Sequence, residues 1–198
     1  MKKIIGIDID GVLTCEEKGN SNIWEIKLAE YLKKDINRCH DVYNFKDAFN
    51  ITSDELDGFI KKHLYDIYET LQPASGAINV LSKLNKLNFK IYLITARDEK
   101  YRNVTENWLS KYHIPYDLLY HEDNKAPLAV KKNISLFIED NKNNTLELLK
   151  NNIPVILVNK YHNKNLQKRN NIFRVDNWQE IENIIFDFYD ITDQQSVI

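Results

Sequence analysis

Short apolar runs alternate with helix-like segments along most of the chain. The runs predict strands at residues 3–9, 89–95, 116–120, 134–138 and 153–158, with a short edge strand at 172–175. Because these runs are apolar at successive positions, they are typical of parallel strands that are buried on both faces. The pattern predicts an α/β fold with a Rossmann-like parallel sheet flanked by helices.

The segments between these runs carry apolar residues three and four positions apart, as in helices that pack one face on a sheet. Ala77, Val80, Leu81 and Leu84 form the clearest stripe of this kind. Helices are predicted at residues 77–87, 100–112, 125–132, 143–151 and 178–189. The polar tail from Thr192 is expected to fray.

One segment, residues 14–72, interrupts this alternation, because it is rich in aromatic residues and contains no strand-like run. A helix is expected at 23–32, and Thr52 followed by Glu55 predicts a capped helix that runs to Leu71. Pro73 and Gly76 mark the return to the α/β pattern. We expect an α/β core formed by residues 1–13 and 73–198, with a small helical cap (residues 14–72, hereafter the cap segment) inserted after the first strand.

Composition and charge exclude several classes of protein. Of the 198 residues 43% are hydrophobic, which is enough for a core and excludes a wholly disordered chain. The formal charge of −2 lacks the excess of positive charge that is typical of proteins that bind duplex nucleic acid or an anionic membrane. The apolar runs are too short to cross a membrane, and Asp8 and Asp10 interrupt the N-terminal run in a way that is atypical of a signal peptide. With Cys15 and Cys39 as the two cysteines, we expect reduced thiols and a cytoplasmic protein.

Asp8 and Asp10 stand at the carboxyl end of the first predicted strand, where parallel sheets bind ligands. Residues two apart on a strand point the same way, so we expect both carboxylates to project together. Holding two close carboxylates in the ionised form requires a cation such as Mg²⁺, which prefers oxygen ligands. Gly11 allows a sharp turn after the pair. The simpler interpretation is a strand that ends in an Asx-type turn.

Three further segments end or follow predicted strands. Thr95 ends the second strand, Lys125 opens a helix, and Glu139 and Asp140 end the fourth strand. Each has an ordinary explanation when taken alone: a helix cap, a solvated lysine, or acids that complement a helix dipole. Their shared position at the same edge of a parallel sheet favours a common site instead.

The order Asp-x-Asp, Thr, Lys, Glu-Asp resembles the four motifs of the haloacid dehalogenase superfamily of phosphohydrolases. The resemblance covers about residues 1–15 and 73–160, and the cap segment occupies the place of that superfamily's inserted cap. Ile-Asp-Ile-Asp-Gly-Val-Leu-Thr, Ile-Thr-Ala-Arg and Ile-Glu-Asp look most like the bacterial nucleotidases related to the 5'(3')-deoxyribonucleotidases.

The resemblance implies a role for each matching residue. Asp8 is implied to be the nucleophile that forms an aspartyl-phosphate, and Asp10 the general acid and base. It further implies that Asp8, the backbone carbonyl of Asp10 and Asp140 hold Mg²⁺, and that Thr95 and Lys125 bind the substrate phosphate.

Two positions stay open at this point. The fourth motif has Glu139 before Asp140 where many relatives have Asp or Gly, so the metal is assigned to Asp140 and Glu139 is left as a neighbouring partner. Lys131 and Lys132 lie closer in sequence to the fourth motif, but Lys125 is preferred because the start of its helix faces the ligand edge. Arg97 is expected either to reach the substrate or to form an ion pair elsewhere.

The resemblance implies a small phosphoester as the substrate, most simply a (deoxy)nucleoside monophosphate, and the cap segment offers aromatic rings on which a base could stack. Tyr43, Phe45 and Phe49 lie in a stretch without helical periodicity and are the candidates for substrate contact. The alternatives are a phosphatase of another small phosphoester such as a sugar phosphate and, further off, a phospho-receiver or binding module without catalysis.

Overall fold

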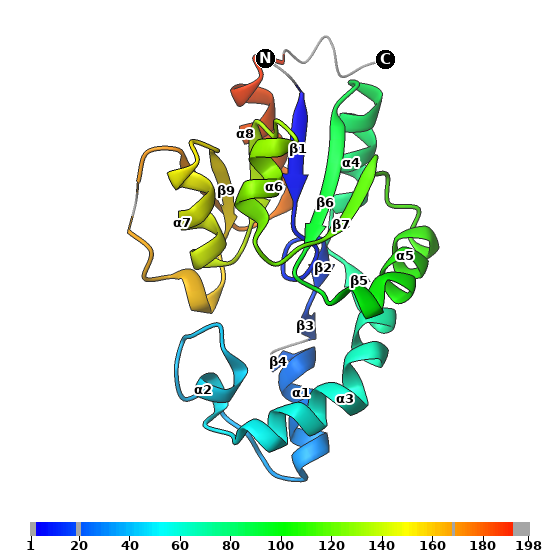
Figure 1. The fold of residues 1–198 in the computed structure, drawn as a ribbon, viewed down its shortest axis with the longest axis vertical. Helices are drawn as coiled ribbons and strands as arrows, with labels where there is room; N and C mark the ends of the chain where they lie inside the picture. The colour runs from blue at the N-terminus through cyan, green and yellow to red at the C-terminus, as the bar shows by residue number, and fades with distance from the viewer. Residues whose placement is uncertain (1–2, 19–20, 168, 192–198) are drawn as a thin grey trace.

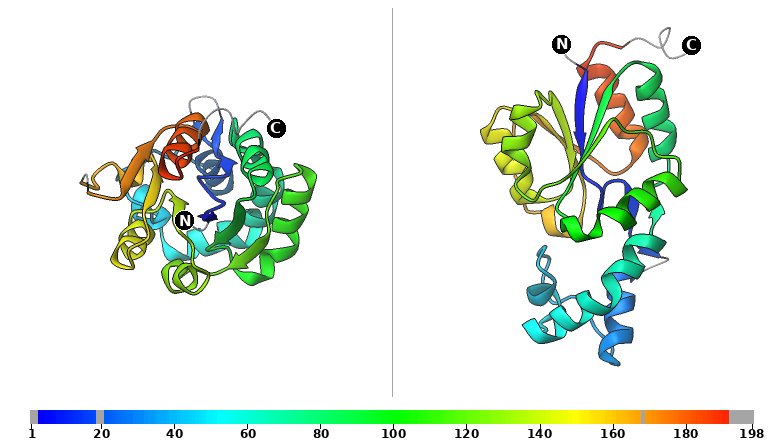
Figure 2. Two further views of the ribbon diagram at one scale, coloured as in Figure 1. Left: turned by 90° about the horizontal axis from the view of Figure 1, so that it is seen from above. Right: turned by 45° about the vertical axis from the view of Figure 1, so that its right-hand side comes forward.

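The computed structural model describes residues 3–18, 21–167 and 169–191. Its core is a six-stranded sheet in which all neighbouring strands are parallel (Figures 1 and 2). Across the sheet the strands are β10 (Ile172–Val175), β9 (Val155–Val158), β8 (Leu136–Glu139), β1 (Ile4–Ile7), β6 (Lys90–Thr95) and β7 (Leu118–His121). The expected Rossmann-like α/β fold is therefore confirmed. The tail from Thr192 lies outside the described residues.

The central position of β1 explains where the chemistry-bearing residues meet. In the sheet, Ile7 is in register with Leu93 of β6 on one side and with Ile138 of β8 on the other. The carboxyl ends of β1, β6 and β8 consequently adjoin at one edge, hereafter the carboxyl edge, where parallel sheets bind ligands.

Helices cover both faces of the sheet. On one face α4 (Ala77–Lys86) and α8 (Trp178–Phe188) share a hydrophobic cluster with Ile5 and Ile7 of β1. On the other face α6 (Lys125–Lys131) and α7 (Lys142–Lys150) pack on Ile94 and Phe137. The connections contain α5 (Arg102–Lys111) and two short 3₁₀ turns, η1 (Glu99–Tyr101) and η2 (Tyr161–Asn163). Among the described residues, no helix has the length and apolar character needed to cross a bilayer.

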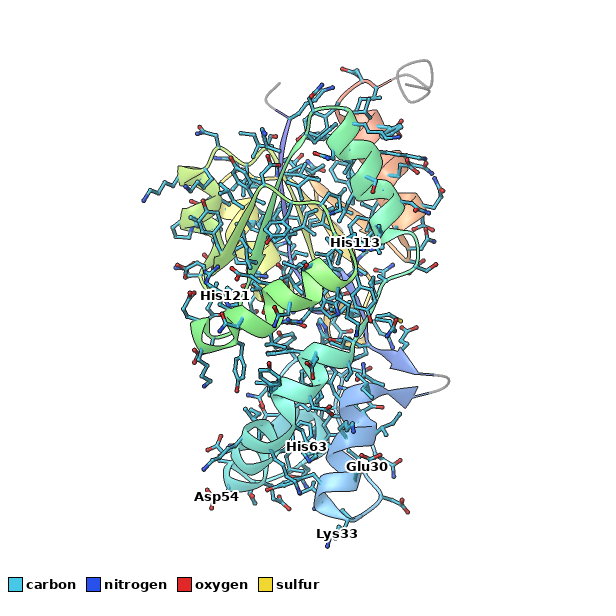
Figure 3. The ribbon with its side chains drawn as sticks, turned by 90° about the vertical axis from the view of Figure 1, so that its right-hand side faces the viewer. Glu30, Lys33, Asp54, His63, His113 and His121 are labelled. Carbon is cyan, nitrogen blue, oxygen red and sulfur yellow. The ribbon has the colours of Figure 1, made fainter. Side chains whose placement is uncertain are left out.

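The cap segment lies beyond the carboxyl edge of the sheet (Figure 1). Its helices α1 (Ile23–Leu32), α2 (Phe45–Phe49) and α3 (Ser53–Thr70) pack around a hydrophobic cluster of their own. Figure 3 shows Lys33 and Asp54 at the end of this segment that lies away from the sheet. The predicted start of α3 is present, because Thr52 Oγ1 accepts from the Glu55 N–H at 3.2 Å while the Glu55 carboxylate accepts from the Thr52 N–H at 2.8 Å.

The junction between core and cap segment differs from the expectation that residues 14–72 contain no strand. Two short antiparallel pairs are present: β2 (Thr14–Cys15) with β5 (Gln72–Pro73), and β3 (Glu17–Lys18) with β4 (Ser21–Asn22). Each strand has two residues, which is too short to produce an alternating pattern in the sequence. The pairing of β2 with β5 ties together the two points where the chain leaves and re-enters the core.

Candidate active site

Asp8 and Lys125 form the centre of the site. Lys125 Nζ lies 2.8 Å from Asp8 Oδ2 and 2.8 Å from Glu139 Oε2. Asp8 directly follows β1, whereas Lys125 is the first residue of α6, so the helix start brings its side chain to the carboxyl edge. The structure thus places Lys125 beside Asp8, whereas Lys131 is exposed and Lys132 Nζ lies 5.1 Å from the centroid of the Tyr120 ring.

Burial makes the electrostatics of this cluster strong. Lys125 is 2% exposed and Glu139 0%. Burial alone would lower the pKa of Lys125, but the charges of Asp8 and Glu139 outweigh it and raise that pKa, so the side chain is an ammonium ion. Burial, reinforced by the charges of Glu139 and Asp140, raises the pKa of Asp8 well above its usual value, although Lys125 opposes the shift. Three carboxyl groups therefore face one ammonium group, an excess of negative charge that a further cation would offset.

The donor set fits a divalent cation. Asp8, Glu139 and Asp140 each offer a carboxylate oxygen, and these atoms lie within 4.8 Å of one another. Oxygen ligands of this kind suit a hard ion such as Mg²⁺. Glu139 accepts from Lys125, from the Asn141 N–H at 3.0 Å and from Asn144 Nδ2 at 3.3 Å, whereas Asp8 accepts from Lys125 and from the Ile9 N–H. Asp8 and Asp140 are consequently the carboxylates with the most free acceptor capacity.

Gly11 is required by the position of Asp140. Its φ of +75° lies in the left-handed region that favours glycine, and a Cβ built on Gly11 would collide with the Asp140 carboxylate. On its other side, Asp140 Oδ2 lies 3.3 Å from His162 Nε2. The backbone carbonyl of Asp140 accepts from Asn163 Nδ2 at 2.8 Å, which fixes the end of β8.

Asp10 has a different cationic partner from Asp8. Its carboxylate accepts two hydrogen bonds from Arg97, from Nε at 2.8 Å and from Nη2 at 2.6 Å. The first strand is shorter than expected: β1 ends at Ile7, so Asp8 and Asp10 follow it in a turn where the Leu13 N–H donates to the Ile9 carbonyl. Asp8 is thus paired with Lys125 at the start of α6, and Asp10 with Arg97 in the loop after β6.

Arg97 connects this part of the site to the cap segment. Its side chain is fully buried, and Nη1 donates to Thr105 Oγ1 at 3.2 Å. The guanidinium carbon lies 3.8 Å from the centroid of the Tyr68 ring, which belongs to α3. Thr95, at the end of β6, is 1% exposed, and its Oγ1 accepts from the Arg97 N–H at 3.2 Å. Of the two alternatives for Arg97, the structure shows the ion pair.

A cavity of about 370 Å³ lies between the carboxyl edge and the cap segment, within the size range of small-molecule sites. Aromatic and aliphatic side chains from the cap segment form most of its wall, with polar side chains from both parts. The lining residues are Asp10, Glu16, Trp24, Tyr43, Asn44, Phe45, Leu56, Phe59, Ile60, Leu64, Tyr68, Asp140, Tyr161 and His162.

The three aromatic candidates differ in position. Tyr43 and Phe45 line the cavity, whereas Phe49 does not. Phe49 is 6% exposed and packs in the hydrophobic cluster of the cap segment, with its ring centroid 5.3 Å from that of Phe45. Phe49 is therefore corrected from a candidate for substrate contact to a core residue, since the last residue of α2 is buried in the cap segment's own core.

Sequence reasoning missed several polar and aromatic residues of the wall. Glu16, Trp24, Tyr161 and His162 carry no motif, and Tyr68 lies at helical spacing that predicts a core position. Glu16 and His162 are far apart in the chain and line one cavity only because the cap segment and η2 meet over the sheet. A local pattern does not contain this information.

Solved structures with low sequence identity share the fold. A haloacid dehalogenase-like family hydrolase from Streptococcus pneumoniae is similar with a TM-score of 0.62 and 14% identity, covering 93% of this chain and 98% of that chain. A HAD-superfamily hydrolase from Ehrlichia chaffeensis gives 0.58 and 13%, covering 96% and 99%. These two similarities show that the chain shares the fold of haloacid dehalogenase-like hydrolases.

Sequence comparison then defines the family. The family model described as "5' nucleotidase, deoxy (Pyrimidine), cytosolic type C protein" matches residues 2–190. A nucleotidase from Clostridium acetobutylicum is 32% identical over 184 residues, which cover 91% of this chain and 92% of that protein. The chain belongs to this 5'-nucleotidase family. The predicted superfamily and nucleotidase branch are confirmed, and the alternative of a receiver or binding module without catalysis is set aside.

Proposed function

We propose that the protein is a Mg²⁺-dependent nucleotidase that releases phosphate from (deoxy)nucleoside monophosphates through an aspartyl-phosphate at Asp8. The observation that carries this proposal is the buried Lys125, which joins Asp8 and Glu139 at 2.8 Å each beside the aromatic cavity. An ammonium group in this position matches the charge of a phosphoryl group that is transferred to Asp8.

The proposed reaction has two steps. In the first, an Asp8 carboxylate oxygen attacks phosphorus and the bond to the ester oxygen breaks, while Asp10, which is protonated when the substrate binds, donates its proton to that oxygen. In the second, a water gives its proton to Asp10 and attacks phosphorus, so that the bond to Asp8 breaks and inorganic phosphate leaves. Thr95 and Lys125 hold the phosphoryl oxygens in both steps. The two hydrogen bonds from Arg97 hold the Asp10 carboxylate in place.

Asp8, the backbone carbonyl of Asp10 and Asp140 would hold the Mg²⁺ ion. When bound there, the ion offsets negative charge on the phosphoryl oxygens. The acidic cluster supports this assignment, and the hydrogen bonds of Glu139 to Lys125 and Asn141 favour Asp140 over Glu139 as the ligand.

The aromatic lining of the cavity is the observation that supports a nucleoside as the leaving group. The residues of the carboxyl edge recognise a phosphoryl group alone, so selectivity has to come from the cap segment, which we propose closes over the substrate. Tyr43 and Phe45 are the proposed stacking residues for the base. The nucleotidase relative agrees with this substrate class. We further propose that the enzyme works in the cytoplasm, in keeping with its two free cysteines.

Hydrolysis of p-nitrophenyl phosphate, with and without Mg²⁺, tests the mechanism. Asp8→Asn keeps the size of the side chain but removes the nucleophilic charge, so turnover is expected to fall to background. The same change at the exposed Asp57 of α3 provides the matched control and is expected to leave the rate as in the wild type. Turnover near the wild-type rate in Asp8→Asn would overturn the aspartyl-phosphate mechanism.

A further inference from the structure

The wall of the cavity has an uneven charge. Asp10 and Asp140 lie at its reacting end, and Glu16 adds a third carboxyl group from the junction between β2 and β3. Among the described side chains that line the cavity, none belongs to Lys or Arg. Lys125 serves the phosphoryl group at the carboxyl edge and does not line this cavity.

Hydrogen bonds fix Glu16 in the wall. Its Oε1 accepts from Trp24 Nε1 at 3.0 Å, and its Oε2 lies 3.5 Å from Asn22 Nδ2. Both donors come from the start of the cap segment's first helix, so the carboxylate position depends on the fold of the cap segment. A carboxylate has about four acceptor sites, and two of them remain free for a ligand.

The surroundings of Glu16 bring its titration close to neutral pH. Burial is the largest cause, and the negative charges of Asp10 and Asp140 add to it, which raises the pKa of Glu16 to about 7. The hydrogen bond from Trp24 and the charge of Lys160 act in the opposite direction. The negative charge of Glu16 in turn contributes to raising the pKa of the Tyr161 hydroxyl, which belongs to η2. Above neutral pH the cavity therefore gains one full negative charge.

His162 also lines this cavity. The His162 side chain is 4% exposed and lies edge-on to the rings of Tyr43 and Tyr161, at centroid distances of 5.1 and 4.9 Å. Its Nε2 faces Asp140, whereas its Nδ1 has no hydrogen-bond partner among the described residues. Because Nδ1 is enclosed by surrounding atoms, His162 contributes packed ring surface to the wall of the cavity.

We propose that Glu16 is a specificity-determining residue that selects the leaving group by charge. The cavity accepts phosphomonoesters whose leaving group is uncharged and offers a hydrogen-bond donor to Glu16. It rejects leaving groups that carry a second phosphate or a carboxylate. This inference rests on the proposed function and narrows its substrate class to monophosphates of neutral nucleosides.

The physical basis is the lack of compensation for a second anion. A further phosphate in the cavity would lie near Glu16. Arg97 pairs with Asp10, and the proposed Mg²⁺ ion would offset Asp140, whereas no Lys or Arg among the described lining residues offsets Glu16. For charges several ångströms apart at the effective dielectric constant of a protein site, one such repulsion corresponds to about a tenfold loss in affinity. An uncharged hydroxyl or amino group in the same place instead donates a hydrogen bond to the carboxylate.

The test compares thymidine 5'-monophosphate with thymidine 3',5'-bisphosphate, which differ by one phosphate. The measured quantity is kcat/KM for release of the 5'-phosphate, with thymidine 3'-monophosphate as the product from the bisphosphate. At pH 8 the wild type is expected to prefer the monophosphate by about tenfold or more. In Glu16→Gln, which keeps the size of the side chain, the preference is expected to shrink severalfold.

Glu17→Gln provides the matched control. Glu17 is exposed, adjacent in the chain and absent from the lining of the cavity, so this variant removes the same charge without touching the site. Its preference is expected to equal that of the wild type. Between pH 6 and pH 8 the preference is expected to grow more in Glu17→Gln than in Glu16→Gln. The ionisation of the substrate phosphates contributes equally to both variants and cancels in this comparison.

The outcomes separate the inference from the proposed function. A wild-type preference near one, or equal preferences in Glu16→Gln and Glu17→Gln, would overturn charge selection while p-nitrophenyl phosphate is still hydrolysed. The wild-type comparison needs no substitution and so does not depend on the folding of a variant. If p-nitrophenyl phosphate is not hydrolysed either, the proposed function itself fails, and the inference fails with it.

Discussion

The carboxyl edge of the sheet and the cap segment are built from different interactions. At the edge, buried charged groups hold one another at hydrogen-bond distance, as Lys125 does with Asp8 and Arg97 with Asp10. In the cap segment, rings meet at larger centroid distances, for example 5.8 Å between Trp24 and Phe45. Hydrogen bonds and buried charges depend steeply on geometry, whereas ring contacts tolerate small displacements.

This difference fits the roles proposed for the two regions, phosphoryl transfer at the carboxyl edge and recognition of the leaving group at the cap segment. A site that transfers a phosphoryl group needs charges in one fixed arrangement before the substrate arrives. A site that recognises a leaving group can use apolar surface and a few polar groups. The two regions touch where the Tyr68 ring covers Arg97 and where Glu16 lies near Asp10. Substitutions in each region should therefore change different measured quantities.

The largest expected effect separates the two regions at Asp10. Asp10→Asn removes the proton donor, so alkyl phosphates, whose leaving groups need protonation, are expected to lose about 10²–10⁴ in kcat. The loss on p-nitrophenyl phosphate is expected to be much smaller, because nitrophenolate leaves without a proton. Steady-state rates on both substrates, with phosphorylation of Asp8 shown to limit each rate, provide the measurement. Equal losses would count against the acid–base role of Asp10.

Lys125 gives the next largest effect, on stability. Lys125→Met leaves Asp8 and Glu139 buried without their cation, and breaking a buried pair in this way costs about 3–5 kcal/mol of unfolding free energy. Urea unfolding measures the loss, and Mg²⁺ is expected to recover part of it by binding the remaining carboxylates. Lys131→Met, at the exposed far end of the same helix, is expected to stay within about 0.5 kcal/mol of the wild type. If Lys125→Met also changes the free energy of unfolding by no more than about 0.5 kcal/mol, the ion pairs of Lys125 do not stabilise the fold.

The same contrast explains which features of the structure could be predicted from the sequence. The strands were predictable because their apolar runs are continuous, and the motif residues because each stands at the end of such a run. The partner of Asp10 was not predictable, since it depends on where the chain turns after Ile7. In the cap segment, Phe49 was expected to face the cavity but is buried in the core, whereas Tyr68 was expected in the core but lines the cavity. The position of each ring depends on how the helices pack, which a local sequence pattern does not determine. Glu16 and His162 come together only in the complete fold.

A smaller effect is expected from the rings that line the cavity. Tyr43→Ala or Phe45→Ala is expected to lower kcat/KM for a nucleoside monophosphate relative to a sugar phosphate, by an amount equivalent to about 1–3 kcal/mol. Tyr65→Ala, at an exposed ring of the same segment, is the control and should leave this ratio at the wild-type value. Comparable kcat/KM for a nucleotide and a simple sugar phosphate in the wild type would contradict nucleotide selectivity while leaving the phosphatase intact.

The smallest effect concerns stability where the two regions meet, at Glu16. Its pKa is raised from 4.5 to about 7 in the folded protein, so the unfolded chain releases this proton at lower pH than the folded one. Glu16 therefore destabilises the fold as pH rises from 4.5, and the penalty is complete above about 7. Glu16→Gln removes it, so the Tm of the variant relative to the wild type is expected to increase from pH 5 to pH 8. After allowance for partial exposure the gain is about 1–2 kcal/mol, or a few degrees. Glu17→Gln should show no such trend. A Tm difference between Glu16→Gln and the wild type that does not change with pH would mean that the cavity does not raise the pKa of Glu16.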